Sequence, residues 1–231
     1  MVANLINGIA IIIGSLLGIS FKKFINKDIS NRILNIIGVI ILIFGFTGVF
    51  KAMITIEDGR LVSNYELILL TSLVLGSLIG ELLKIDDRID NFGIYLEKKL
   101  GKSNFSIGFI NASLIFCIGA MAIVGSINAG LGDSNILYLK SIIDGVTALV
   151  LASTLGFGVV FASITVILYQ GIFIILTLLV GDVFSSQFID TFSMVGYAMI
   201  ICIGINFTFN KQLKIGNLLP ALLIVIIYNL F

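Results

Sequence analysis

Long apolar stretches follow one another along the whole chain, with only short polar segments between them. Eight of these stretches reach the roughly 20 residues that an α-helix needs to cross a hydrocarbon core of about 30 Å. They cover residues 3–21, 33–53, 65–83, 104–127, 135–155, 159–180, 191–209 and 213–230. The pattern predicts an all-α, polytopic transmembrane helical bundle, with residues 1–231 forming a single integral membrane domain.

One apolar stretch, residues 135–180, is too long for a single crossing. Gly156 and Gly158 flank Phe157 near its middle, and glycine allows the chain to reverse without steric cost. We therefore expect a hairpin at this point, with one span on each side.

Basic residues gather in alternate connections. The positive-inside rule places loops rich in Lys and Arg on the cytoplasmic side. With 22–32, 84–103 and 210–214 inside, 11 of the 14 basic residues lie on that side. This arrangement predicts a multi-pass membrane protein with both termini outside and supports the count of eight spans.

The longest polar connection is residues 84–102. Apolar residues recur there at near-helical spacing among charged residues, namely Ile85, Ile89, Phe92 and Leu100. The pattern predicts an amphipathic helix at the cytoplasmic interface. Such a helix either packs on the bundle as a connection or provides a regulatory or lipid-sensing surface.

The composition narrows the possible functions. The chain is 58% hydrophobic and 12% charged, whereas soluble domains carry about 25% charged residues. There is no histidine, which excludes imidazole metal ligands and Ser-His catalysis, and no Walker motif for ATP. We expect no enzymatic activity, no cofactor, no metal site and no nucleic-acid partner.

Two short motifs repeat. Gly14–Gly18 reads GSLLG near the end of the first span, and Gly76–Gly80 reads GSLIG near the end of the third. A looser copy, Ala152–Gly156, ends the fifth. These copies indicate either a duplicated helical hairpin, as in many transporters, or small residues that let helix backbones approach closely.

Asp144 is the most informative single residue, because it lies two to three turns into a predicted span. A charged side chain at such depth costs about 2.5–3.5 kcal/mol on insertion scales and usually faces the bundle interior. The helix face that carries Asp144 continues with Thr147, Leu151 and Thr154. This face favours a hydrophilic path with Asp144 as a cation or proton site. The alternative is an ion pair with Lys140 at the outer interface.

Other polar residues suggest neutral ligands. Gln170 lies near the centre of the sixth span, where its amide must bond another helix or a ligand. Asn7 in the first span, and Glu66 and Glu81 at the ends of the third, are weaker candidates. The remaining candidates for binding an ion or solute are Asn111, Ser126, Asn128 and Asn206.

Several residues are candidates for bends rather than binding. Glycines between Gly125 and Gly132 indicate either a broken helix, whose free backbone groups could bind ions, or a continuous helix with close packing. Pro220 either kinks the last span or lies in its first turn. The full set of candidate hinge and structural residues is Gly119, Gly125, Gly156, Gly158, Asn217 and Pro220.

Three motifs in order carry a family resemblance: FCIGAMAIVGSINAG (116–130), KSIIDGVTALVLASTLGFGVVFA (140–162) with LYQG (168–171), and KIGNLLPALL (214–223). Together they resemble the bacterial membrane proteins grouped as domain of unknown function 554, over essentially the whole chain. The resemblance implies a polytopic inner-membrane protein of a group described only as uncharacterised or as transport proteins, without a substrate or an established site. The matched positions are Gly119, Gly125, Ser126, Asp144, Gly145, Ser153, Gly156, Gln170, Gly171, Asn217 and Pro220.

The leading hypothesis is therefore a secondary carrier or channel for a small ion or polar solute, with Asp144 as the cation or proton site. The alternative is a non-transporting membrane subunit, sensor or lipid-binding scaffold, in which the polar residues only fasten helices. Membrane lipid is the one expected partner in both cases, and the glycine-rich helix faces also suit a homodimer.

Overall fold

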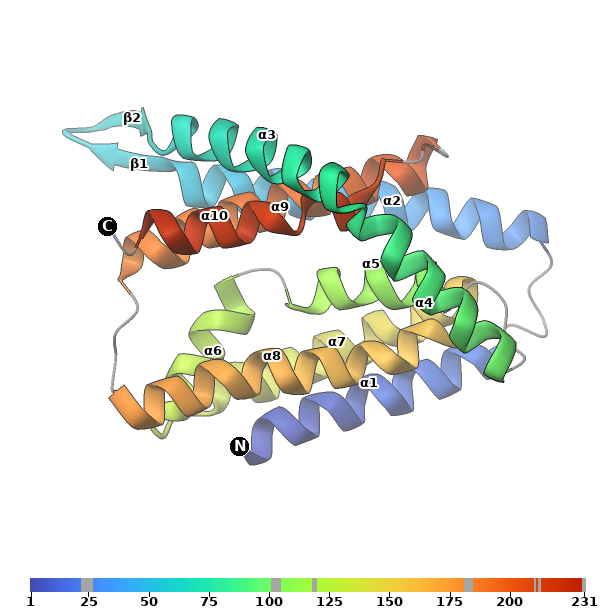
Figure 1. The fold of residues 1–231 in the computed structure, drawn as a ribbon. Helices are drawn as coiled ribbons and strands as arrows, with labels where there is room; N and C mark the ends of the chain where they lie inside the picture. Colours follow the sequence, from blue (N-terminus) through green and yellow to red (C-terminus); the bar gives the residue numbers. More distant parts are fainter. Residues whose placement is uncertain are drawn as a thin grey trace. The chain divides into compact units, whose positions relative to one another are not determined.

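Helices make up nearly all of the structure, a computed structural model that describes residues 1–21, 27–100, 105–117, 120–180, 185–209, 211 and 213–229 (Figure 1). The helices before the middle of the chain are α1 (Val2–Phe21), α2 (Lys27–Met53), α3 (Glu66–Leu83), α4 (Ile85–Leu100) and α5 (Phe105–Cys117). The later ones are α6 (Ala120–Gly130), α7 (Asn135–Leu155), α8 (Gly158–Val180), α9 (Ser186–Phe209), the 3-10 turn η2 (Ile215–Leu218) and α10 (Pro220–Tyr228). The predicted all-α fold class is confirmed.

Six of these helices are long and apolar enough to cross a membrane: α1, α2 from Asn31, α3, α7, α8 to Leu179 and α9. A seventh crossing is possible if α5 and α6 act as one bent span. Ile215–Tyr228 is apolar but shorter than a usual span. Among the described residues, length and composition thus support six or seven crossings, and the eighth stays a prediction.

The described residues divide into two compact units. The first unit contains Met1–Leu34 and Asp90–Val183, and the second contains Asn35–Ile89 and Phe184–Phe231. Helices α2 and α4 have residues in both.

In the first unit, α1 lies along α7 (Figure 1). A methyl group at Gly14 would collide with the backbone carbonyl of Gly145, and one at Gly18 with that of Leu149. The GSLLG motif therefore brings two helix backbones into direct contact, as small residues do in membrane bundles. On another side α1 meets α8, where Gly8 makes room for Ile167.

The chain reverses between α7 and α8, as predicted. Helix α7 ends at Leu155 and α8 begins at Gly158. Gly156 has φ 81° and ψ −149°, a conformation that is essentially limited to glycine. Gly158 packs against the backbone of Phe105 in α5. Gly156 thus serves the expected reversal, whereas Gly158 serves helix packing.

Of the two alternatives for Gly125–Gly132, the structure shows the continuous helix with close packing up to Gly130 and not the broken helix. Helix α6 continues through Gly125 to Gly130, whereas α5 ends at Cys117 and the axes of the two helices differ by 60°. Gly125 instead packs against Ile136 and Leu137 of α7. The predicted continuous span 104–127 is accordingly two helices. Gly119 lies outside the described residues.

In the second unit, glycines again set the helix contacts. Gly38 of α2 packs on Thr208 of α9, and Gly45 packs on Ile201. The GSLIG motif of α3 repeats the behaviour of its counterpart in α1, because Gly76 meets the backbone of Ala221 in α10 and Gly80 meets that of Asn217 in η2. Pro220 is the first residue of α10, so it lies in a first turn, where a missing N–H has no cost, rather than in a kink.

A β-hairpin joins α2 to α3, an element that the hydropathy pattern did not predict. Strands β1 (Ile54–Glu57) and β2 (Arg60–Ser63) pair antiparallel, with Ile56 opposite Leu61. Asp58 and Gly59 both have positive φ, which is typical of the tight hairpin turns that favour Asp-Gly. The sequence EDGR carries this signal.

Helix α4 confirms the helix predicted over residues 84–102. Lys84 separates it from α3 by adopting a left-handed conformation with φ 51°. The first turn of α4 carries Asp86 and Asp87, which suit the positive end of a helix dipole.

Candidate functional site

Three helices of the first unit bring polar side chains together in the protein interior. Lys140 and Asp144 come from α7, Asn7 from α1 and Gln170 from α8. The exposed fractions of these four residues are 5%, 5%, 0% and 0%. We call them the Asp144 cluster.

The bonds within the Asp144 cluster centre on one carboxylate. The Lys140 ammonium forms an ion pair with Asp144 Oδ2, because residues four apart lie on one helix face. Asn7 Nδ2 donates to the same oxygen at 3.0 Å, and donates to Gln170 Oε1 at 3.4 Å. Each charge is therefore buried with its counter-ion, without which a charge in this setting would be very costly.

The cluster also has unused hydrogen-bonding capacity. Asn7 Oδ1 and Gln170 Nε2 are buried without a partner among the described residues. One turn away, Asn4 donates to the Ile167 carbonyl at 2.9 Å, while its own Oδ1 also lacks a partner. Buried polar groups nearly always have partners in native proteins. These free acceptors and the free donor therefore suit a small polar guest, such as water or a cation.

The structure brings two of the predicted binding residues together, Asp144 and Gln170. Thr147 is half-buried on α7, and Asn111 is buried on α5. Ser126 donates to the Ala122 carbonyl of its own helix at 2.6 Å. Asn128 is half-buried near the end of α6. None of these four has a described hydrogen bond to the Asp144 cluster.

Asn206 belongs to the second unit, where its amide donates to the Leu213 carbonyl and accepts from the Leu213 N–H, both at 2.9 Å. Its side chain thus shapes the connection from α9 to η2.

Sequence reasoning underestimated Asn7. Its importance comes from a hydrogen bond between residues 137 apart in sequence, which no local pattern encodes. A partial signal exists, because Asn4, Asn7, Ile11, Gly14 and Gly18 are all buried on α1. Two amides on the same face as close-packing glycines indicate an interior face rather than a lipid-facing one.

The second unit has its own polar junction where α3, α4 and η2 meet. Asn217 Nδ2 donates to Glu81 Oε2, and Asn217 Oδ1 accepts from the Asp86 N–H at 2.8 Å. Asp86 Oδ1 in turn accepts from the Gly216 N–H at 2.7 Å. Asn217 therefore connects α3, α4 and η2.

Lys214 lies at the edge of this junction and donates to Asp87 Oδ1 at 3.1 Å. The Asp87 carboxylate, with Glu81 nearby, raises the pKa of the Lys214 ammonium above its ordinary value. A raised pKa means that this contact is complete below the ordinary lysine pKa and is lost as the pH rises through the raised value. Lys214 is therefore charged at neutral pH.

No group of three or more Cys, Asp and Glu side chains that could hold a metal ion occurs among the described residues.

Six long apolar helices, one of which carries a buried and neutralised charge pair, are typical of a multi-span helical membrane protein. The chain belongs to the family described as "Protein of unknown function (DUF554)", whose model matches residues 2–230. It is 31% identical to the uncharacterised membrane protein YdfK of Bacillus subtilis (strain 168), over 97% of this chain and 93% of that protein. It is 26% identical to the uncharacterised protein YqgA of Escherichia coli (strain K12), over 97% of this chain and 94% of that one. No solved structure matches the chain.

Proposed function

We propose that this protein is a transport protein of a bacterial inner membrane, a secondary carrier or channel for a small ion or polar solute, with Asp144 as its cation or proton site. The observation that carries the proposal is the buried Lys140–Asp144 pair, which lies in α7, a helix long enough to cross a membrane. Asn7 of α1 donates a hydrogen bond to the Asp144 carboxylate of this pair. Ionisable groups inside membranes commonly mark ion pathways and proton relays.

Charge balance indicates how such a site would work. The Lys140–Asp144 pair is neutral as it stands, and a second positive charge would leave the buried site with an uncompensated charge. A cation that binds Asp144 is therefore favoured when Lys140 gives up its proton at the same time. This coupling would exchange one small cation for one proton and keep the site neutral throughout.

Amides of the cluster and of the neighbouring Asn4 would complete the site. Asn7 Oδ1 and Asn4 Oδ1 are carbonyl-type acceptors without described partners, and such oxygens suit hard cations. Gln170 would hold Asn7 in place through its Oε1. No Walker motif is present, so an ion gradient, or no energy source in a channel, would drive the flux.

A second function rests on a different property of the same pair. Lys140 and Asp144 satisfy each other within one helix turn, which is also what a purely structural ion pair would do. In that case the protein would be a non-transporting membrane subunit, sensor or scaffold. We propose no enzymatic activity in either case, since no nucleophile–base pair stands out in the sequence.

Flux measurements on purified protein in vesicles test the proposal, after a thermal-shift screen across ions, amino acids and organic acids has selected the solute. Asp144→Asn should abolish flux, because the amide lacks the negative charge that balances a bound cation and cannot exchange a proton. Asp58→Asn is the matched control, since Asp58 lies in the exposed hairpin turn at a positive φ that Asn also tolerates. If Asp144→Asn lowers stability but leaves the flux per folded molecule intact, the structural function is correct instead.

A further inference from the structure

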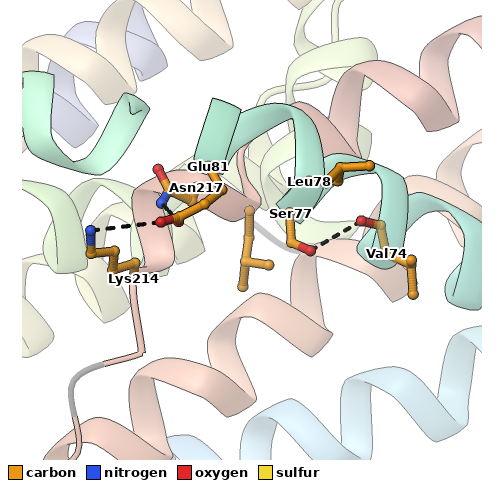
Figure 2. Close-up of a pocket in the computed structure, with 7 residues that line it drawn as sticks. Val74, Ser77, Leu78, Glu81, Lys214 and Asn217 are labelled. Carbon is orange, nitrogen blue, oxygen red and sulfur yellow. Dashed lines mark hydrogen bonds and ion pairs between the residues drawn. The ribbon is translucent and has the colours of Figure 1, made fainter. Parts of the chain in front are cut away.

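The second unit contains a groove along one side of α3 that the proposed transport function does not use (Figure 2). Its volume is about 460 Å³, within the range of small-molecule sites. Val74, Ser77, Leu78 and Glu81 form its α3 wall. They are spaced i, i+3, i+4 and i+7, so they lie on one face of the helix. The opposite wall consists of Lys214, Asn217 and Leu218.

This groove is apolar at one end and charged at the other. Val74 and Leu78 are each 55% exposed on a helix that is apolar enough to cross a membrane, so lipid chains are their natural solvent. At the other end, Lys214 Nζ lies 4.0 Å from Glu81 Oε1 and 3.1 Å from Asp87 Oδ1. The charged end coincides with the end of α3, where the chain turns at Lys84 into the charged helix α4.

The charges at this end select the kind of headgroup. Lys214 offers an ammonium to a phosphate, whereas Glu81 and Asp87 offer carboxylates to a cation. The side chains of all three remain 46–65% exposed, so a ligand can reach them. Because two carboxylates face one ammonium, a purely anionic headgroup would meet net repulsion. A headgroup with both a phosphate and an ammonium complements the site.

We propose that the α3 groove binds one zwitterionic phospholipid whose headgroup carries a primary ammonium, that is, a phosphatidylethanolamine. Its phosphate contacts Lys214, its ammonium donates to Glu81 and Asp87, and one acyl chain lies along Val74 and Leu78. A primary ammonium has three N–H donors for these carboxylates, whereas the quaternary ammonium of phosphatidylcholine has none. The proposal depends only on the second unit and holds whether or not Asp144 carries an ion.

The absence of tryptophan from the chain provides a direct test. A Val74→Trp variant places the only indole in the apolar part of the groove. Leu75→Trp is the control, because Leu75 is exposed on α3 but does not line the groove. Each variant is reconstituted in three kinds of phosphatidylcholine vesicle. In each kind, a tenth of the lipid is a brominated lipid that quenches indole fluorescence: phosphatidylethanolamine, phosphatidylcholine or phosphatidylglycerol.

For Val74→Trp, brominated phosphatidylethanolamine should be enriched about threefold near the indole over the other two lipids, the size expected of one or two exposed charge contacts. For Leu75→Trp, all three should quench equally. Adding Glu81→Gln and Lys214→Gln to Val74→Trp should remove the preference, whereas adding Lys211→Gln should keep it. Equal quenching at Val74→Trp, a preference for phosphatidylglycerol, or a preference that survives the double substitution would overturn the proposal.

A second measurement needs no substitution. Native mass spectrometry of the wild-type protein in mixed micelles of the three lipids should show one phosphatidylethanolamine retained at collision energies that remove the others. Equal loss of the three lipids would overturn the proposal even if the groove variants fail to fold.

Discussion

At the scale of single residues, the Asp144 carboxylate joins the buried polar side chains of the first unit, because it pairs with Lys140 and accepts a hydrogen bond from Asn7. The i, i+4 spacing of Lys140 and Asp144 made their pairing foreseeable, because it depends only on helix geometry. Their burial was less foreseeable, since the sequence was also consistent with an exposed pair at the membrane interface. The part played by Asn7 could not be predicted, because it depends on how α1 packs against α7 and α8.

A double-substitution cycle tests whether Lys140 and Asp144 act as a unit. Lys140→Met alone should lower the free energy of unfolding by about 3–5 kcal/mol, since it leaves a buried carboxylate without its counter-ion. Lys140→Met combined with Asp144→Asn should recover most of that loss, because no unpaired charge remains. The measurement is reversible unfolding in mixed micelles, and purely additive effects would show that the two groups are not coupled.

At the scale of elements, close helix contacts were better predicted than helix breaks. The two small-residue motifs, GSLLG and GSLIG, both form backbone contacts, although with different partner helices. Gly156 marks a true reversal because its positive φ requires glycine. The glycines of α6 left two alternatives open, and the structure shows that Gly125 serves packing and not a bend. A glycine that relieves crowding and one that breaks a helix look the same in a single sequence.

The contact made by the GSLLG motif predicts a steep cost for one methyl group. Gly14→Ala should lower the free energy of unfolding by about 1–3 kcal/mol, because the new Cβ would overlap the Gly145 carbonyl and force α1 away from α7. Gly171→Ala is the matched control in α8, where the nearest atom to the new Cβ would be Asn4 Nδ2 at 3.4 Å. Thermal unfolding in detergent measures both, and equal stabilities would contradict the tight α1–α7 contact.

At the scale of the whole molecule, hydropathy predicted the class of protein and most of the spans, because a bilayer imposes length and polarity on every crossing. It did not fix the number of crossings. The pair α5 and α6 passes the criteria for a span only when taken together, and Ile215–Tyr228 is short. Whether these two segments cross the membrane decides between six, seven and eight crossings.

Labelling of single cysteines resolves the α5–α6 pair. In a variant with Cys117 and Cys202 replaced by Ala, Asp58→Cys and Asp133→Cys should both react with an impermeant thiol reagent from outside, whereas Lys211→Cys should react only after permeabilisation. All three native residues are exposed. If Asp58→Cys and Asp133→Cys react from opposite sides, α5 and α6 do not cross together, and the orientation drawn from the basic loops is wrong for the second half of the chain.

The backbone contact between α1 and α7 also limits how the protein can work. At Gly14 and Gly18 the backbone of α1 contacts the backbone of α7 without side chains between them. The two helices therefore cannot shift relative to one another and must move together as a rigid body. Opening a route to the Asp144 carboxylate would then mean moving α8, with Gln170, away from that rigid pair. The moving part of a transport cycle would be α8 together with α5, because Gly158 of α8 is itself in backbone contact with Phe105 of α5.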